Sequence, residues 1–421
     1  MNISRIRSIT GRDRHRISAT VEWEDSPQRP IELYFETTSE QAAYLSALPE
    51  PFLLACLMPA LYAQERRIAI EGEVCPQLLH GLTTNLGWYQ QWYHRKPIRI
   101  ETQVASSCRF SGTTGRVAAS FLSGGVDSLY TLRANRLQVP AGHPLAIQDC
   151  ILVDGFDMSW EASKHPQDEV FWRALESLTP VAKAAGVRLI PVRTNLRHLN
   201  DSVQFWMRWY FGAALASVAH AGMSKIHTAA IASASDDVTR NGPWGSTGFT
   251  DINYSSSAVR VIHDGLWVSR FEKLQVISEW APALQSLRVC TSNHPDQVNC
   301  GACEKCIRTM TALVALGRLK DTSVFGATDV SEESLSRLWI RQGFVSEYYT
   351  ELLQPLRDQG RDDLVRGIKV LLARHRKVQA KVEGKDWKGR IKRLDQRYWG
   401  GRLLATKRAV FAKAQSIGAQ C

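Results

Sequence analysis

Hydrophobic and polar side chains follow two different periods in the middle of this chain. From residue 116 to residue 233, short apolar runs are separated by longer segments in which apolar residues recur every three or four positions. The short runs are typical of buried strands and the longer segments of amphipathic helices. Strands separated by helices of this length form a parallel sheet with right-handed crossovers, so the pattern predicts a doubly wound α/β fold. The predicted strands are 116–122, 149–155, 187–194 and 225–233, and the predicted helices are 127–137, 166–186 and 201–222.

The first 112 residues have a different pattern, which predicts a separate α+β accessory domain over residues 1–112. Four segments have the alternation of strands, and one long apolar segment, interrupted by proline, is typical of a helix. The small polar residues that follow are typical of a linker. The strand segments are 19–25, 31–38, 66–74 and 98–105, and the helical segment is 39–64.

The remainder of the chain is first polar, then helical, and finally basic. A polar stretch at 235–257 follows the fourth predicted strand, and helices are predicted at 270–280 and 304–317. We therefore expect the α/β domain to occupy residues 113–325 and a basic helical extension to occupy residues 326–421.

The positive charge is concentrated in this extension. The formal net charge is +11, and residues from Val365 to Cys421 contain 16 Lys and Arg against three Asp and Glu. With Trp387, Tyr398 and Trp399 among the cations, this tail could bind nucleic acid. We favour an amphipathic helix pair with solvated cations, and an acidic protein partner would fit the charge equally well.

Nothing in the sequence indicates a membrane protein. The hydrophobic content is 44% and the charged content 22%, as in a globular protein. The first residues are polar and basic, so we expect no secretory leader, and the longest apolar runs are too short to span a bilayer. We expect a soluble, cytoplasmic protein.

The sequence SGGVDS, residues 123–128, lies between the first predicted strand of the α/β region and its helix. Its two glycines allow backbone N–H groups to approach a phosphate at a helix N-terminus, and the hydroxyls of Ser123 and Ser128 can donate to phosphate oxygens. The carboxylate of Asp127 would repel a phosphate there unless it accepts hydrogen bonds or Mg²⁺ lies between the two negative charges. The turn therefore predicts a binding site for a polyphosphate that Mg²⁺ bridges to Asp127. The alternative is an ordinary Gly-Gly turn with Asp127 or Ser128 as a helix cap.

This turn resembles the signature of the PP-loop ATP pyrophosphatases, the adenine nucleotide α-hydrolase group. The resemblance implies the PP-loop (HUP) type of the doubly wound fold and cleavage of ATP between its α and β phosphates. It also implies transfer of AMP to a substrate oxygen, and displacement of AMP by a nucleophile. The residues that it places at ATP, pyrophosphate and Mg²⁺ are Ser123, Gly124, Gly125, Val126, Asp127 and Ser128, with Ser123, Asp127 and Ser128 in catalytic roles.

Four of the nine cysteines lie within seventeen residues, in a C-x9-C-x2-C-x2-C spacing. In a chain without a secretory leader, such a cluster predicts a metal site rather than disulfides. Four thiolates suit tetrahedral Zn²⁺ and leave no position for water, so a structural zinc is expected. An iron–sulfur cluster is the alternative. The predicted ligands are Cys290, Cys300, Cys303 and Cys306.

A PP-loop followed by a late cysteine knuckle and an arginine resembles the 7-cyano-7-deazaguanine synthase family. Members activate a carboxylate with ATP, add ammonia to form an amide, and dehydrate the amide to a nitrile. The resemblance covers about residues 116–318 and implies that Arg308 contacts phosphate or substrate. It also places Asp154 at the ATP, although the family's motif at this strand end is replaced here by VDGFDM.

The family's substrate loop is replaced here by NGPWGSTGFTDINYS, which implies a different or larger acceptor. Polar and aromatic residues of this loop are candidates to bind it, and a merely solvated loop is the alternative. These candidates are Trp244, Ser246, Thr247, Asp251 and Asn253. Lys273 could approach a phosphate, or it could be a surface lysine paired with Glu272.

Together these features predict an ATP-dependent carbon–nitrogen ligase with ATP and Mg²⁺ as cofactors and a structural Zn²⁺. The expected substrates are a small carboxylate, such as a deazaguanine acid, and ammonia or an amine, which could belong to a protein. A tRNA-modifying PP-loop enzyme of the thiolation or lysidine type is one alternative. A non-catalytic, zinc-stabilised nucleotide-binding protein is another, and the intact Asp127 argues against it.

Overall fold

The computed structural model divides into two compact units, Met1–Asp329 and Val330–Cys421. The aromatic residues predicted to interleave with cations in the basic tail lie beyond the residues that the structure describes. The described residues are 1–110, 112–156, 167–234, 243–290 and 297–382.

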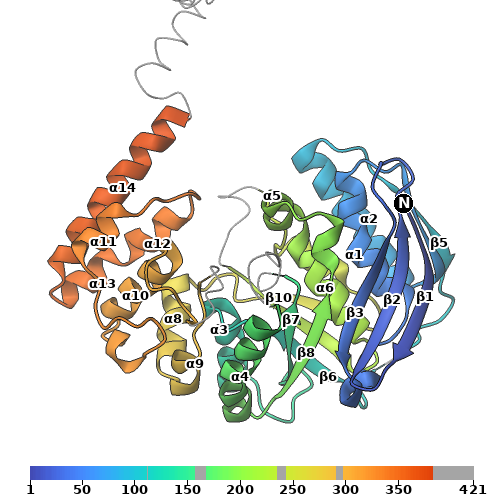
Figure 1. The fold of residues 1–421 in the computed structure, drawn as a ribbon, viewed down its shortest axis with the longest axis horizontal. Coiled ribbons are helices and arrows are strands. Elements are labelled where there is room, and N and C mark those ends of the chain that lie inside the picture. The colour runs from blue at the N-terminus through green and yellow to red at the C-terminus, as the bar shows by residue number, and fades with distance from the viewer. Residues whose placement is uncertain (111, 157–166, 235–242, 291–296, 383–421) are drawn as a thin grey trace, which may run out of the picture. The chain divides into compact units, whose positions relative to one another are not determined.

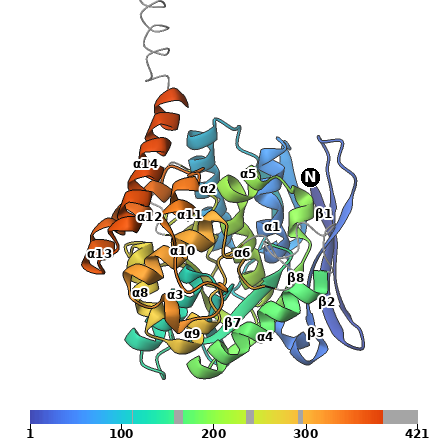
Figure 2. The same ribbon diagram turned by 60° about the vertical axis from the view of Figure 1, so that its left-hand side comes forward.

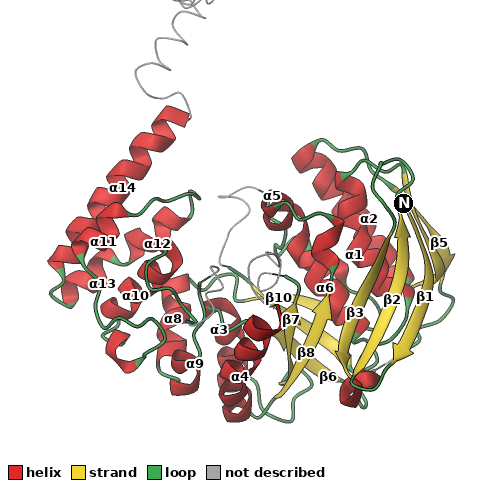
Figure 3. Cartoon of the chain, in the orientation of Figure 1, coloured by secondary structure: helices red, strands yellow, loops and turns green. Residues whose placement is uncertain are grey.

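The first unit is built on one mixed sheet of ten strands (Figures 1 and 3). The strand order is β10-β9-β6-β7-β8-β3-β2-β1-β4-β5. The pairs β8-β3, β3-β2 and β2-β1 are antiparallel and the other six are parallel. The strands are β1 (Asn2–Thr10), β2 (Arg14–Glu22), β3 (Ile31–Thr38), β4 (Arg67–Val74), β5 (Arg99–Val104), β6 (Val117–Phe121), β7 (Ile147–Asp154), β8 (Arg188–Thr194), β9 (Ile226–Ala232) and β10 (Arg260–Asp264).

Helices pack on both faces of the parallel strands. α1, α2 and α6 share a large apolar core with one face of the sheet, and α3 and α4 lie on the other face (Figures 1 and 2). The helices are α1 (Pro49–Tyr62), α2 (Pro76–Tyr93), α3 (Val126–Gln138), α4 (Gln167–Ala185), α5 (Val203–Phe205), α6 (Phe211–Ala221), α8 (Arg270–Ser278), α9 (Ala281–Gln285) and α10 (Glu304–Ala315). Shorter helical turns are η1 (Ser39–Tyr44), η2 (Leu196–Leu199), η3 (Trp206–Tyr210), η4 (Asp251–Tyr254) and η5 (Leu319–Asp321).

The antiparallel strands β2 and β3 place apolar side chains on one face and mostly polar side chains on the other. Ile17 and Val21 of β2 and Phe35 of β3 are fully buried in the core shared with α1 and α6. Side chains alternate between faces along a strand, so Arg16 and Glu36 point to the opposite side. No helix of the described chain lies in front of this side in Figure 1. A polar row on such a face can remain hydrated, as is common in antiparallel sheets.

The structure confirms an α/β protein, with a sheet that is mixed rather than parallel throughout. The predicted strand at 31–38 coincides with β3, and all four strands predicted between 116 and 233 are present. The predicted helix at 201–222 contains a π-helical turn at Trp206–Tyr210. β1, β10 and α2 had no counterpart among the predicted elements.

Residues 1–112 contribute strands to the same sheet as the α/β region. The junction is an antiparallel pairing of β3 with β8, in which Phe35 is opposite Thr194 and Glu36 is opposite Arg193. The side chain of Asn195 strengthens this junction by accepting from the Tyr34 amide and donating to the Glu32 carbonyl. One sheet therefore runs through both segments.

The second unit is helical in its described part. Ser331 caps its first helix by accepting a hydrogen bond from the Ser334 amide, and Arg366 pairs with Glu332 at 2.9 Å. The buried residues Leu335, Leu364 and Ile368 provide its apolar contacts. Its helices are α11 (Glu332–Arg337), α12 (Val345–Glu351), α13 (Leu353–Asp358) and α14 (Asp362–Val382).

Within the described ranges, no helix combines the length and the apolar character needed to cross a bilayer.

Candidate active site and metal centre

The SGGVDS turn lies at the carboxyl end of β6, where the strand order of the parallel sheet reverses. The connection from β6 to β7 runs in one direction along the sheet, and β9 and β10 lie on the other side of β6. In open α/β sheets, ligands bind at this switch point, outside the carboxyl ends of the strands. The fold therefore places residues 123–128 where a ligand is expected.

The backbone of the turn requires its first glycine. Gly124 has φ +80°, and a Cβ at this position would lie 3.3 Å from the Ser286 carbonyl oxygen and from the Arg288 Cβ. The Gly124 carbonyl also accepts a hydrogen bond from the Arg288 amide at 2.8 Å. Gly125 then forms the N-cap of α3 with extended backbone angles. A side chain at Gly124 would be strained and crowded at the same time.

The two serines hold the turn from within. The Ser128 hydroxyl donates to the Gly125 carbonyl at 3.1 Å and accepts from the Ser123 amide at 3.3 Å. The Ser123 hydroxyl lies 3.2 Å from the Ser128 hydroxyl. Ser123 is exposed, whereas Ser128 is buried. Ser123 is thus the hydroxyl that a ligand in solvent can reach.

Asp127, in the first turn of α3, is held between two cations of α8. Its carboxylate accepts from Arg270 at 2.6 Å, and the Lys273 ammonium lies 3.5 Å from its other oxygen. Burial alone would raise the pKa of the Asp127 carboxyl, but the positive charges of Arg270 and Lys273 outweigh it, so its pKa lies below the usual value. The site therefore holds one carboxylate and two cations.

Lys273 is fully buried rather than on the surface. Its ammonium donates to the Ser233 carbonyl, at the carboxyl end of β9, at 2.5 Å. Burial lowers the pKa of Lys273, and the Asp127 carboxylate opposes this effect. Glu272 instead forms a capping box with Ser269 at the start of α8. Lys273 thus links α8, α3 and β9 at the switch point.

Arg270 is a residue of this site that the sequence reasoning missed. The spacing of the two residues could have indicated it, because residues three apart on a helix lie on the same face. Lys273 was already a candidate, and Arg270 is three residues before it. What the helix pattern could not show was that this face of α8 packs against α3.

The donor set fits Mg²⁺ only in part. Mg²⁺ in phosphate sites is held by one or two carboxylates together with substrate phosphates, and Asp127 supplies one carboxylate. That carboxylate is already paired with Arg270 and Lys273. A metal ligand role for Asp127 would require these cations to move toward the phosphates.

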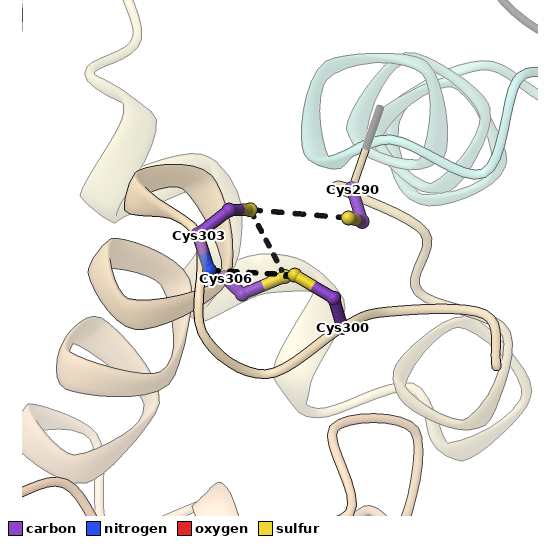
Figure 4. A group of neighbouring side chains, drawn as sticks. All are labelled: Cys290, Cys300, Cys303 and Cys306. Carbon is purple, nitrogen blue, oxygen red and sulfur yellow. Dashed lines mark hydrogen bonds between the residues drawn. The ribbon is translucent and has the colours of Figure 1, made fainter. Parts of the chain in front are cut away.

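The four predicted cysteine ligands converge at the start of α10 (Figure 4). Their sulfur atoms all lie within 4.8 Å of one another. The Cys290–Cys303 and Cys300–Cys306 sulfur distances are 3.8 and 3.9 Å, and four sulfurs around a tetrahedral zinc would be about 3.8 Å apart. A hydrogen bond with the Cys306 sulfur lowers the pKa of the Cys303 thiol. The cluster could hold a metal ion such as zinc.

The cysteine cluster and the turn are connected through residues 288–290 and Asn299. The Arg288 amide binds the Gly124 carbonyl. The next two amides, of Val289 and Cys290, both donate to the Asn299 side chain, which is buried. Loosening of the cluster would therefore be transmitted to the backbone of the turn.

Two residues assigned by the resemblance have their observed contacts elsewhere. Arg308 is buried on α10 and lies 3.4 Å from Glu304 of the same helix. Asp154, at the end of β7, lies 3.3 Å from Arg193 of β8.

Three of the five loop residues expected to bind an acceptor are buried, and two of these, Ser246 and Asp251, are hydrogen-bonded to each other. The Ser246 hydroxyl donates to Asp251 at 2.5 Å, and the His263 Nδ1 lies 2.8 Å from the same carboxylate oxygen. The side chains of Ser246, Thr247 and Asp251 are buried. The Asn253 amide donates to Asn85 of α2, and Trp244 is half-buried. These contacts anchor the loop to the body of the unit.

Comparisons with family models, with curated proteins and with solved structures found no match to this chain.

Proposed function

We propose that this protein is an ATP-dependent carbon–nitrogen ligase of the AMP-forming, PP-loop type. The observation that carries the proposal is the SGGVDS turn at the switch point of a parallel sheet, with Asp127 held by Arg270 and Lys273. Backbone amides at a helix N-terminus and two nearby cations suit a polyphosphate. The order β8-β7-β6-β9-β10 also suits the PP-loop (HUP) fold.

The chemistry divides into two displacements. A carboxylate or carbonyl oxygen of the substrate attacks the α-phosphorus of ATP, the bond to the β-phosphate breaks, and pyrophosphate leaves with the electron pair. An amine nitrogen then attacks the activated carbon, the bond to AMP breaks, and the nitrogen releases a proton to solvent. Mg²⁺ would neutralise phosphate charge when bound.

The protein residues act on the leaving pyrophosphate. The amides of the turn and the exposed Ser123 hydroxyl can donate to its oxygens, and Arg270 and Lys273 supply positive charge close by. Groups that hold the developing charge of a leaving phosphate lower the barrier most when they are fixed in advance. Asp127 fixes both cations, so we assign it a positioning role in addition to any metal contact.

The four-cysteine cluster is proposed to hold a structural Zn²⁺. Four sulfur ligands complete a tetrahedral shell, which leaves no coordination position for a reacting water. The link from Cys290 to Arg288 and Gly124 gives the cluster a role in supporting the turn.

The proposed substrates are a deazaguanine-type carboxylic acid and either ammonia or a protein amine. To test the function, the protein is incubated with ATP, Mg²⁺ and 7-carboxy-7-deazaguanine, with and without ammonia, and AMP, ADP and pyrophosphate are quantified. Equal amounts of AMP and pyrophosphate that depend on the acid are expected.

The matched variants are Asp127→Asn and Asp321→Asn. Both remove the charge of an aspartate that is paired with arginine, but Asp321 pairs with Arg318 on the surface. Asp127→Asn should lower the rate of AMP formation at least about 100-fold, and Asp321→Asn should not change it. Formation of ADP and phosphate, or equal rates in both variants, would contradict the proposal.

A further inference from the structure

A polar cavity lies on the same unit and extends from the end of β7 across β8 and β3 to β2. Its volume is about 860 Å³. Its floor is the helix-free face of β2 and β3, and one end is formed by Asp154 and Gly155, where β7 ends. Its wall is the segment 194–201 that follows β8. The cavity therefore joins residues of the N-terminal segment to the carboxyl ends of two parallel strands.

Charged side chains of alternating sign cross the floor along one row of the sheet. Asp154 of β7 is opposite Arg193 of β8, Arg193 is opposite Glu36 of β3, and Glu36 is opposite Arg16 of β2. Paired residues in neighbouring strands point to the same face. The row is built on strands, which hold their side chains more precisely than loops do.

Glu36 orients two arginines at the floor. Its carboxylate accepts from Arg14 at 3.1 Å and from Arg16 at 2.9 and 2.7 Å. The Glu36 side chain is 5% exposed, whereas Arg14 is 56% and Arg16 37% exposed. The Arg16 guanidinium also lies 4.0 Å from the centre of the Tyr34 ring. An arginine has five N–H donors, so both guanidinium groups keep donors beyond those that Glu36 accepts.

The composition of the cavity favours an anionic ligand. Among its described lining residues are four arginines against three acidic residues, and no lysine. The planar guanidinium matches carboxylate and phosphate oxygens in pairs, and orienting it in advance reduces the entropy lost on binding. Arg14 and Arg16 share one carboxylate, which leaves a net positive charge at this point of the floor.

The wall of the cavity is fixed to the floor. The Asn195 side chain bonds to the backbone of β3 on both sides of Leu33. Gly155 has φ +95°, and a Cβ there would lie 1.9 Å from the Thr194 carbonyl oxygen. This close approach of the chains after β7 and β8 closes one end of the cavity.

We propose that this cavity binds an oxyanion group, a carboxylate or a phosphate, with Arg14 and Arg16 as its ligands. The proposed function concerns the turn at the end of β6. Binding of the oxyanion itself does not depend on it. Arg14 and Arg16 are on β2, four strands from β6 in the sheet order, so this site is separate from the turn.

The test measures binding of two simple probes by saturation-transfer NMR. Succinate represents the carboxylate and glycerol 3-phosphate the phosphate. The full chain is compared with Arg16→Gln, Arg14→Gln and the matched control Arg7→Gln. Arg7 is on β1 and pairs with Glu32 on the surface, and it does not line the cavity.

We expect the unchanged protein and Arg7→Gln to bind one or both probes with equal affinity. Arg16→Gln should weaken that binding at least about tenfold, because it removes charge-assisted hydrogen bonds, and Arg14→Gln should weaken it as well. The preferred probe assigns the oxyanion as carboxylate or phosphate. Binding of neither probe, or equal binding in Arg16→Gln and Arg7→Gln, would overturn the proposal.

Two further measurements keep the result clear. Circular dichroism establishes that each variant folds, and Arg14→Gln, at the more exposed position, decides the question if Arg16→Gln does not fold. Probe binding needs no turnover. A protein that binds the probe through Arg16 but forms no AMP would contradict the proposed function and leave the cavity assignment standing.

Discussion

The parallel and antiparallel parts of the sheet present polar groups in different ways. In the parallel part, both faces are covered by helices, and the polar groups lie in the chain segments that follow β6, β7 and β9. In the antiparallel part, β2 and β3 keep one face free of helices and place Arg14, Arg16 and Glu36 directly on it. One sheet therefore carries two kinds of polar site. At the carboxyl ends of the parallel strands, backbone amides of a turn face the solvent, and on the open face of the antiparallel strands, charged side chains do.

The two parts also differ in what supports them. The turn depends on segments far along the chain, because Arg270, Lys273 and Arg288 contact it from positions after residue 260. The charged face depends on strand register and on one buried carboxylate, Glu36. Perturbations should therefore affect the two parts unequally, and the four predictions below follow from that difference.

Loss of the proposed Zn²⁺ should have the largest effect and should act mainly on the parallel part. Cys306→Ser, or treatment with a chelator, should lower the melting temperature by about 10 °C or more, because metal binding contributes directly to folding. Cys108→Ser, at an exposed cysteine outside the cluster, is the control. Calorimetry and elemental analysis of the purified protein measure the effect and identify the metal.

Hydrogen exchange locates the effect of metal removal. Amides of residues 122–129 should lose protection, whereas those of β2 and β3 should keep it. An unchanged melting temperature in Cys306→Ser, relative to Cys108→Ser, would show that the cluster is not a structural metal site.

Gly155→Ala should destabilise the junction between the two parts by about 3 kcal/mol. The new Cβ would lie 1.9 Å from the Thr194 carbonyl oxygen, at a residue with φ +95°. Gly186→Ala is the matched control, because Gly186 has φ +65° but no atom within 4 Å of the added Cβ. It should cost about 1 kcal/mol. Urea unfolding measures both, and equal costs would mean that the Thr194 contact relaxes freely.

Acid should weaken the parallel part first, through His220 of α6. His220 is fully buried, with Nδ1 2.9 Å from the Ala216 carbonyl and Nε2 3.1 Å from the Ser256 hydroxyl. Burial lowers its pKa from 6.5 to about 4. The unfolded chain therefore binds the proton first, and stability falls as the pH drops from about 6.5 toward 4.

The expected loss from this histidine is about 3 kcal/mol over that range. In His220→Gln, the unfolding free energy should fall less between pH 7 and pH 4.5 than it does in the unchanged protein. The substitution itself should lower stability by the same amount at both pH values. His80→Gln, at an exposed histidine of α2, should keep the dependence of the unchanged protein. The same pH dependence in both variants would assign the effect to other groups.

Glu36→Gln should have the smallest effect on stability, about 1 kcal/mol, because both of its arginine partners are partly exposed. Glu101→Gln, which weakens the surface pair with Arg67, is a matched control and should cost less. Urea unfolding measures both. A cost of several kcal/mol for Glu36→Gln would show that the charged face supports the fold as strongly as the turn region does.

Much of the fold could be predicted from the sequence, because the parallel strands are buried on both faces and appear as apolar runs. The strands between 116 and 233 were found in this way, and β3 was found from its alternation of apolar and polar residues. β1 and β10 were missed, since their patterns are partly polar, with burial confined to a few positions. Helix α2 is polar on one side and was missed as well.

The candidate site divides in the same manner. The turn at 123–128 and the four cysteines were predicted, because in each the essential residues are close in sequence. Arg270 was missed, and Ser246, Thr247 and Asp251 proved to be buried in a hydrogen-bonded network. Burial of a polar loop depends on the elements that pack around it, and these cannot be read from the loop itself.

The sequence by itself determined the local chemistry of this protein: a glycine turn that can approach an anion, a four-thiol cluster, and the apolar strands between them. Each of these features is formed by residues that are close together in the sequence, where the spacing along the chain sets the distance between the side chains. Only the tertiary structure decided that Arg270 and Lys273 hold Asp127, and that β3 pairs with β8 to form the charged cavity. Those contacts join residues more than a hundred positions apart, and their free energy comes from burying whole faces against each other rather than from any local pattern.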